Sequence, residues 1–394
     1  MRGSCRGVVV GAAIALGVGV LAAPPASGSE PPTSSSSPTR APAVQVSAGA
    51  GWSFARLEND TVWGWGSPLM LGDGIYGHRF DPHQCVSRFD DVIAVSGGDY
   101  ASSIVLRADG TAWSFGSNGD GELGDGTTTS RYDPVQVVGL TDVVAVSMGD
   151  RFSLALRADG TVWAWGDNDY GQLGDGTTIE RHTPVQVSGL TDVTAISAGY
   201  FHSLAVRKDG SVWAWGSNDA GQLGDGTTWD RSTPTIVGGL PAASTVAAGE
   251  DHSMALTAGG DVWAWGANYD GQIGDGSHPR QQLTAVKVPR LAGVTAIAAG
   301  FRFSMAVVGD GTAKAWGSNQ DSTLGIGVSG GHRYRPARVK RLHDVVSLSA
   351  GYEHSMAAET DGSVWTWGKN STRQIGVPDA GEYNKPIMVM KPGS

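Results

Sequence analysis

Short runs in which apolar and polar residues alternate recur along the chain, and residues 191–240 show the arrangement clearly. Four such runs lie within this stretch, at Val193–Ser197, Ser203–Val206, Val212–Trp215 and Pro234–Val237. Alternation with a period of two is typical of strands, because successive side chains point to opposite faces. Turn-forming residues separate the runs, and Asp209-Gly210 predicts a tight hairpin with a primed turn. The stretch therefore predicts four short antiparallel strands.

The same pattern occurs seven times in the chain. The glycine of a W-x-W-G motif stands at Gly66, Gly116, Gly166, Gly216, Gly266, Gly317 and Gly368, so successive units are 50 or 51 residues long. A second glycine, followed by a variable pair, recurs at Gly49, Gly98, Gly149, Gly199, Gly249, Gly300 and Gly351. A four-stranded sheet repeated radially is a propeller blade. We predict an all-β fold, a seven-bladed β-propeller of four-stranded antiparallel blades over residues 44–394.

Tryptophan follows the repeats closely. Of the 14 tryptophans, only Trp52 and Trp229 lie outside the two indole positions of W-x-W-G. Residues two apart on a strand share a face, so each blade is expected to offer paired indoles to its neighbour. Lys314 replaces the first indole of the sixth unit and predicts a weaker or wetter contact there.

The N-terminal residues differ from the repeats. Arg2 and Arg6 precede an uncharged apolar run, Gly7–Ala23, and small residues follow it, which is the order of a secretory signal. We place the signal at residues 1–28 and a Ser/Pro/Thr-rich linker at residues 29–43. A single membrane anchor is the alternative, but the run is short and diluted by glycine. We expect cleavage, release as a secreted, extracellular protein, and no stable membrane insertion.

Charge and cysteine content narrow the possible functions. The formal net charge is −10, and loss of Arg2 and Arg6 with the signal makes it −12. Nucleic-acid affinity comes chiefly from Lys and Arg, so we expect no nucleic-acid partner. Cys5 lies in the predicted signal, which leaves Cys85 as one thiol without a disulfide partner. We expect Cys85 to be buried and unreactive.

The repeats resemble the regulator-of-chromosome-condensation repeat family. The resemblance rests on successions such as Ala198-Gly199-Tyr-Phe-His202-Ser203, then Asp209-Gly210-Ser-Val-Trp213-Ala-Trp215-Gly216, then Gly221-Gln-Leu-Gly224, in all seven units. It implies a seven-bladed propeller but no single function, because members of the family have different functions. The family includes a nuclear nucleotide-exchange factor, a plant ultraviolet-B receptor and, more distantly, a secreted bacterial inhibitor of β-lactamase. The exported, acidic chain favours a secreted bacterial member over the nuclear role, and the variable pairs lack the tryptophans of the receptor.

The variable pairs are the candidate binding residues. Positions that vary freely among repeats of one environment are expected to face outward. Aromatic side chains beside arginine are typical of binding hot spots. The predicted binding set is Tyr100, Asp150, Arg151, Tyr200, Phe201, Glu250, Asp251, Phe301, Arg302, Tyr352 and Glu353. A solvated surface without function is the alternative.

Other candidate chemistry has a simpler structural explanation. The third position after the repeat glycine holds His202, His252 and His354 but also phenylalanine, so packing is favoured over a metal ring. Asp167–Gly171 and Asp120–Glu122 resemble the start of a calcium loop without the closing acid, and turns explain them equally well. Gly327–Gly331 satisfies G-x-S-x-G, but no helix follows to present the serine. We predict no metal, no cofactor and no catalytic residue.

Two classes of function remain open. We favour a monomeric, secreted propeller that binds an extracellular protein through the loops of one face, with inhibition of a secreted or periplasmic enzyme as one form of that role. The alternative is an enzyme or carbohydrate-binding protein that uses the central pocket, where acids such as Asp150 and Glu250 would converge. We expect no enzymatic activity, because no catalytic constellation is present.

Overall fold

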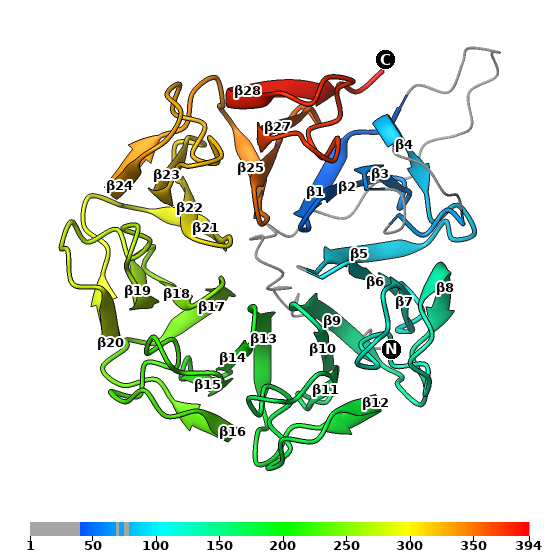
Figure 1. Cartoon of the computed structure of the whole chain (residues 1–394), viewed down its shortest axis with the longest axis vertical. Coiled ribbons are helices and arrows are strands. Elements are labelled where there is room, and N and C mark those ends of the chain that lie inside the picture. Colours follow the sequence, from blue (N-terminus) through cyan, green and yellow to red (C-terminus); the bar gives the residue numbers. More distant parts are fainter. Residues whose placement is uncertain (1–39, 68–70, 75–78, 99, 394) are drawn as a thin grey trace, which may run out of the picture.

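In a computed structural model, which describes residues 40–67, 71–74, 79–98 and 100–393, the chain forms a ring of seven four-stranded antiparallel sheets (Figure 1). Each sheet consists of four consecutive strands, so blade 1 is β1–β4 and blade 7 is β25–β28. The prediction of a seven-bladed all-β propeller is confirmed. The predicted signal, residues 1–28, lies outside the described residues, as does most of the predicted linker.

The strands occupy four concentric positions. The innermost are β1 (Ala43–Ala48), β5 (Val92–Gly97), β9 (Val143–Met148), β13 (Val193–Ala198), β17 (Ala243–Ala248), β21 (Val294–Ala299) and β25 (Val345–Ala350). The second strands are β2 (Trp52–Leu57), β6 (Ser102–Arg107), β10 (Phe152–Arg157), β14 (His202–Arg207), β18 (His252–Thr257), β22 (Phe303–Val308) and β26 (His354–Glu359).

The third strands carry the W-x-W-G motifs, and the fourth form the rim. The third are β3 (Val62–Gly66), β7 (Ala112–Gly116), β11 (Val162–Gly166), β15 (Val212–Gly216), β19 (Val262–Ala267), β23 (Ala313–Ser318) and β27 (Val364–Lys369). The outermost are β4 (Arg79–Cys85), β8 (Arg131–Gln136), β12 (Arg181–Gln186), β16 (Arg231–Ile236), β20 (Gln281–Lys287), β24 (His332–Arg338) and β28 (Glu382–Met390).

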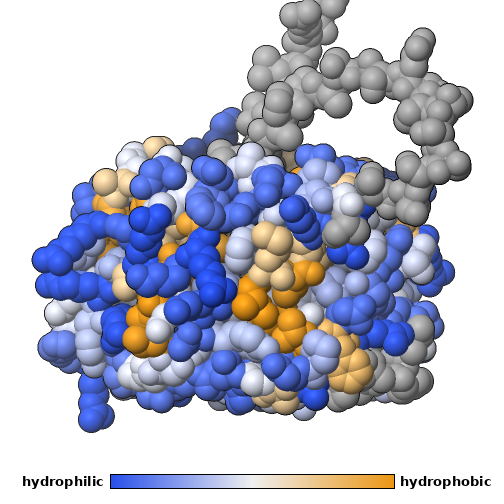
Figure 2. Space-filling view, turned by 90° about the horizontal axis from the view of Figure 1, so that it is seen from above, coloured by the Kyte–Doolittle hydropathy of each residue, from blue (hydrophilic) through white to orange (hydrophobic). Residues whose placement is uncertain are grey.

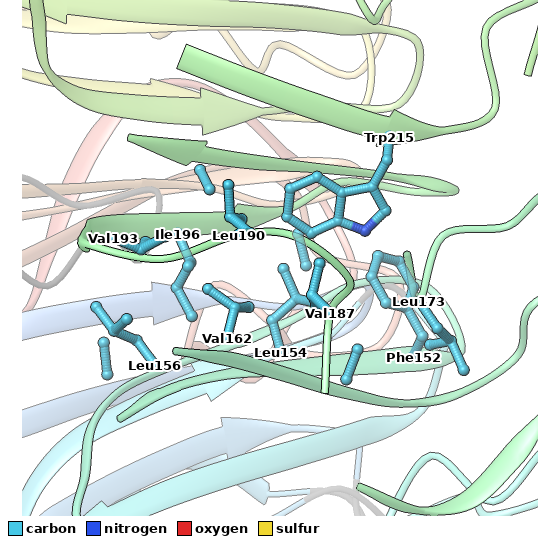
Figure 3. Close-up of a cluster of buried hydrophobic side chains, with 14 residues drawn as sticks. Phe152, Leu154, Leu156, Val162, Leu173, Val187, Leu190, Val193, Ile196 and Trp215 are labelled. Atoms are coloured by element: carbon cyan, nitrogen blue, oxygen red, sulfur yellow. The ribbon is translucent and has the colours of Figure 1, made fainter. Parts of the chain in front are cut away.

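The core lies between blades, and the second indole of W-x-W-G fills it. Trp215 of blade 4 packs on Leu154, Val162 and Leu173 of blade 3 and is fully buried (Figure 3). The first indole, Trp213, is only half-buried, and its Nε1 donates to Ser211 Oγ. The predicted packing between blades is therefore confirmed for the second indole, while the first indole packs against the edge of the same core and remains partly exposed.

The hairpins that join the second and third strands differ from the predicted primed turn. In blade 4, Arg207 N donates to Ser211 O and Gly210 N donates to Arg207 O. Gly210 has a φ of +81°, whereas neither residue 208 nor residue 209 adopts a positive φ. The loop thus has three residues with glycine in the left-handed position, which suits Gly210 because it has no Cβ. The primed-turn prediction was wrong, although the hairpin was placed correctly.

The ring closes between blade 7 and blade 1 without exchange of a strand. Val46 N and Ala48 N of β1 donate to Ser347 Oγ and Ser349 Oγ of β25, at 3.1 and 2.9 Å. An equivalent bond joins Ala198 N to Ser147 Oγ between blades 4 and 3. The interface between blades 7 and 1, which closes the ring, therefore has the same kind of hydrogen bond as the interface between blades 3 and 4.

Candidate functional site

The variable pairs lie on one face of the ring, together with the long loops that join the third and fourth strands. In blade 3, Ser153 near the start of β10 pairs with both Met148 at the end of β9 and Trp165 near the end of β11. The turn after β9 and the loop after β11 consequently emerge at the same end of the blade. We call this end of all seven blades the loop face.

A ring of repeat glycines lies beneath the turns of this face. A Cβ on Gly199 would be 2.6 Å from His202 Cε1 and 2.7 Å from the Gly249 carbonyl oxygen of the next blade. Tyr200 N donates to that same carbonyl. Only glycine fits this close approach, which fixes where the following variable pair projects.

Five aromatic side chains form a continuous row on the loop face. Tyr170 contacts Phe201 (ring centroids 5.0 Å apart), Phe201 contacts Tyr200 (4.7 Å), and Tyr200 contacts Phe301 (6.0 Å). Phe301 stacks on Tyr352 at 3.9 Å. Since Tyr200 belongs to blade 4 and Phe301 to blade 6, the row extends past the turn of blade 5. We call these five residues the aromatic row.

A second cluster forms around Arg151. Its guanidinium lies 5.2 Å from the centre of the Tyr100 ring, and its Nε donates to Asp150 Oδ2 at 3.2 Å. Asp120 of the blade 2 loop lies 3.6 Å from the same side chain. Tyr100 is 51% exposed, whereas Asp150 is only 1% exposed. Asp150 therefore holds Arg151 in place and is not itself accessible to a partner.

Burial dominates the electrostatics of this cluster. It raises the pKa of Asp150 to about 6, against the opposing effect of Arg151, and the charge of Asp167 raises it further. Burial also raises the pKa of Asp167. The carboxylates around Arg151 thus exceed what one guanidinium can neutralise.

The remaining predicted residues lie along blades 5 to 7. Arg302 Nε donates to Glu250 Oε2 at 2.8 Å, and its guanidinium lies 5.0 Å from the centre of the Phe301 ring. Asp251 accepts a hydrogen bond from Gln222 Nε2 at 3.1 Å. Glu353 pairs with Lys369. The structure thus brings four of the five predicted aromatics into one row and leaves Tyr100 in the separate cluster around Arg151. Most of the predicted charges form ion pairs, whereas Asp251 bonds to a neutral amide.

A cavity of about 370 Å³ lies between blades 6 and 7 at the end of the aromatic row. Phe301 and Tyr352 line it together with Asp270, Asp321 and Glu353. Burial, and then the charge of Glu353, raise the pKa of Asp321. The lining combines stacked rings with carboxylates, a composition that suits a cationic or hydroxyl-rich group.

Sequence reasoning did not include in the binding set the loop residues that complete this site. Tyr170, Asp120, Asp270 and Asp321 all lie two positions after the loop asparagine of their blade. That position varies among repeats as freely as the pair after the glycine does, so the same criterion would have found it. The structure also explains the asparagine, because Asn168 Nδ2 donates to Thr177 O and Ile179 O, and its Oδ1 accepts from Leu173 N.

The structure also locates the residues for which the sequence argued against a metal-binding or reactive role. His202, His252 and His354 are fully buried between blades, and within the described residues no cluster of His, Cys, Asp or Glu has a metal-binding arrangement. Cys85 is 1% exposed, and burial raises the pKa of its thiol. No helix in the described part of the chain is long and apolar enough to cross a membrane.

Comparison with known proteins agrees with this architecture. The chain matches the RCC1-like domain over residues 69–393. The human ubiquitin ligase HERC6 is 35% identical over 86 residues, which cover 21% of this chain and 8% of that protein. The ultraviolet-B receptor UVR8 of Arabidopsis thaliana is 30% identical over 98 residues, 24% of this chain and 22% of that one. The matches thus span a quarter or less of these curated relatives.

Solved structures share the fold over nearly the whole ring. Human WBSCR16 superposes with a TM-score of 0.74 at 23% identity, covering 84% of this chain and 94% of that one. Prp20p of Saccharomyces cerevisiae, studied for its binding to Gsp1p and histones, gives 0.74 at 23% identity, covering 89% and 88%. The fold and the family match together define a seven-bladed propeller of the regulator-of-chromosome-condensation class. The match over residues 69–393 shows that the protein belongs to the RCC1-like domain family.

Proposed function

We propose that the chain is a secreted, monomeric propeller that recognises an extracellular protein through its loop face. The aromatic row carries this proposal. Tyr and Phe supply rigid contact area at little conformational cost, and aromatic residues with Arg dominate binding hot spots. Tyr170 is 36% exposed and the other four rings are part-buried, so the row offers an apolar surface already held in place. The relative Prp20p also binds proteins.

The charged residues at the edges of the aromatic row would make binding specific for one partner. Arg302 with Glu250, and Lys369 with Glu353, lie at the edges of the row where a partner would meet them. Paired charges at a rim steer association and reject mismatched partners more than they add affinity. Inhibition of a secreted or periplasmic enzyme is one form that such binding would take.

We further propose that the chain has no enzymatic activity. Three Ser–His pairs, such as Ser304 with His252 at 2.9 Å, have the spacing of a nucleophile and its base. Both side chains are 0% exposed, and the serine hydroxyl donates to the Gln272 carbonyl. No substrate reaches them, which supports a structural role.

A photo-crosslinking experiment tests the protein-binding role. A photoreactive phenylalanine analogue at position 301 would be exposed to secreted and surface proteins of the source organism, beside a control with the analogue at position 236. Ile236 is 54% exposed on the outer strand β16, away from the loop face. We expect one protein to crosslink to the analogue at position 301 and not to the analogue at position 236. Once purified, that protein should bind the Tyr352→Ala variant at least tenfold more weakly than it binds the wild type. Equal labelling at both positions would refute a dedicated face.

The cavity between blades 6 and 7 supports a second candidate, a carbohydrate ligand. Aromatic rings beside carboxylates suit sugar rings, and Asp321 and Glu353 offer acceptors for hydroxyl groups. Glycan-array binding that disappears in Tyr352→Ala, with no crosslinked protein, would favour this candidate over protein recognition.

A further inference from the structure

The outer edge of blade 6 carries a cluster of cations on a protein that is acidic overall. β24 and the residues after it contain Arg335, Arg338, Lys340 and Arg341, all exposed. In the described part of the chain, none of these four side chains forms an ion pair with a carboxylate, although most arginines of blades 2 to 4 do. The net charge of −10 conceals this local excess.

Two replacements in blade 6 create the excess. Blades 2, 3 and 4 neutralise the first arginine of the outer strand with a loop aspartate, as Arg181 does with Asp175 at 2.6 Å. Blade 6 has Ile326 in place of that aspartate, and among the described residues Arg333 donates to the His332 carbonyl and forms no ion pair. The loss of one carboxylate therefore leaves Arg333, a half-buried residue beside the exposed cations, without its usual partner, and it adds to the positive charge of this edge.

The second replacement opposes like charges. Lys314 stands where the other blades have tryptophan, and it is directly opposite Arg338 on the neighbouring strand. Like charges opposite each other destabilise a sheet. Hydrogen bonds from Thr312 lower the pKa of Asp310, and the charges of Arg338 and Lys314 lower it further. Asp310 nevertheless forms an ion pair with neither of these two cations among the described residues. The arrangement weakens the blade, so it has no evident structural purpose.

The cluster extends to both neighbouring blades. Lys314 Nζ donates to Arg290 O of blade 5 at 3.1 Å. A Cβ on Gly327 would lie 3.0 Å from Lys385 Cε and 3.7 Å from Lys340 Cγ, so these two lysines flank one glycine. We call this set the cationic edge: Arg290, Lys314, Arg335, Arg338, Lys340, Arg341 and Lys385. Figure 2 views the rim from the side of blades 6 and 7, and its left part, the side of β24, is strongly hydrophilic.

We propose that the cationic edge binds a linear phosphate polymer through its charges. Four of the seven side chains are arginines, whose planar forks match phosphate oxygens in a bidentate manner. The cations follow one open outer strand and its neighbours, which suits an extended chain with regularly repeated charge. This second surface lies on the rim and does not depend on protein recognition by the loop face.

The structure favours such a polymer over a single-stranded nucleic acid or a membrane. Sequence-tolerant binding of single strands relies on exposed aromatic platforms. Tyr334, the aromatic residue of β24, is half-buried and packs against His278 at 4.2 Å. Peripheral membrane binding is strengthened by apolar side chains that insert. Among the exposed large apolar residues of the described chain, blades 6 and 7 supply only Val328 and Met388.

Titration of the purified full chain with long-chain inorganic polyphosphate at several salt concentrations tests the proposal. We expect binding that weakens steeply with salt, because condensed counterions are released. Lys340→Gln should weaken binding about fivefold and lower the salt slope by about one. Lys208→Gln removes an equally exposed lysine that lies beside Asp192 and Asp209, and it should bind as the wild type does. Equal weakening by both variants would show that only overall charge matters and overturn the proposal.

A triple variant, Arg338→Gln with Lys340→Gln and Lys385→Gln, gives the decisive comparison. It should lose binding about a hundredfold without a fall in melting temperature, since all three side chains are exposed and the loss of Arg338 removes its repulsion with Lys314. Undiminished binding by this variant would refute the cationic edge.

A single-stranded DNA of matched charge that binds tenfold more tightly than polyphosphate, or anionic phosphatidylglycerol vesicles that bind when polyphosphate does not, would also overturn the proposal. Crosslinking at position 301 should be unchanged, which separates this result from the loop face.

Discussion

His252 Nε2 lies 2.9 Å from Ser304 Oγ, across the boundary between blades 5 and 6. The serine hydroxyl donates its one proton to the Gln272 carbonyl at 2.8 Å, so the histidine must donate from Nε2. Its Nδ1 is buried without a hydrogen-bond partner among the described residues. Protonation would place a second N–H in this apolar site, and burial accordingly lowers the pKa of His252 to about 3.

This arrangement predicts a measurable acid sensitivity. The folded-state pKa of about 3 lies below the value of about 6.5 in the unfolded chain. The unfolded state therefore binds more protons, and the contribution of His252 to stability is lost as the pH falls from about 6.5 toward 3. We expect His252→Phe to reduce the loss of unfolding free energy between pH 7 and pH 4.5 by about 2 to 3 kcal/mol. Urea denaturation at both pH values measures it.

Phenylalanine suits this test because Phe152 and Phe303 hold the same position in blades 3 and 6. Asp150 acts in the opposite direction, since its pKa is raised to about 6 and its contribution is lost as the pH rises from about 3.8 to 6. That effect is present in both proteins and cancels in the comparison. Parallel pH profiles for the wild type and His252→Phe would contradict the assignment of a neutral, buried histidine.

The repeat glycines should tolerate no side chain. A Cβ on Gly249 would lie 2.4 Å from His252 Cε1 and 2.6 Å from the Gly300 carbonyl oxygen. The carbonyl belongs to the next blade and cannot move alone, so we expect Gly249→Ala to lower the free energy of unfolding by about 3 kcal/mol. Gly259→Ala is the control, because its nearest neighbour would be Thr257 Oγ1 at 3.8 Å. Thermal denaturation should show a large shift for the first variant and almost none for the second.

The two indoles of W-x-W-G should differ in their contribution to stability. Trp215 is fully buried, and its Nε1 donates to the Gln172 carbonyl of the preceding blade at 2.8 Å. Trp213 is half-buried, and among the described residues its Nε1 donates within its own hairpin, to Ser211 Oγ. We expect Trp215→Phe to destabilise by about 2 kcal/mol and Trp213→Phe by less than about 1 kcal/mol. Guanidinium denaturation of both variants provides the comparison, and equal losses would refute the division of roles.

The fold was predictable because seven copies of the same sequence pattern occupy equivalent positions in the ring. Glycines at fixed spacing and paired tryptophans at Trp213 and Trp215 specify turns and strands without reference to any distant residue. The hairpin type escaped prediction, since Asp209-Gly210 suits both a primed turn and a three-residue loop with glycine last. The choice depends on strand register, which only the folded sheet fixes.

The candidate site was predictable in part for the same reason. Variation among repeats identified Tyr200, Phe201 and Phe301 as outward-facing, and the structure places them in one row. It could not show that Asp150 would be covered by its neighbours, nor that Tyr170 of blade 3 would extend the row to Phe201 of blade 4. Contacts between blades join residues from different repeats, and a pattern within one repeat does not contain them.

Glu122 departs from the pattern of the other loops, and restoring the pattern should stabilise the protein. Blades 3, 4, 5 and 7 have glutamine at this position, and Gln222 Nε2 donates to Ser217 Oγ and Asp251 Oδ1. Glu122 is 0% exposed, and its Oε1 is buried without a hydrogen-bond partner among the described residues. Burial raises the pKa of this carboxyl, against the hydrogen bond that Oε2 accepts from Asp120 N.

A raised carboxyl pKa means that ionisation opposes folding, so the contribution of Glu122 to stability declines as the pH rises above about 4.5. We expect Glu122→Gln to raise the free energy of unfolding at pH 7 by about 1 kcal/mol, because glutamine keeps the acceptor for Asp120 N and removes the buried charge. The gain should shrink below pH 4, where the glutamate is protonated in both states. Chemical denaturation of both proteins at pH 7 and pH 4 measures it, and a gain independent of pH would show that packing, not ionisation, is responsible.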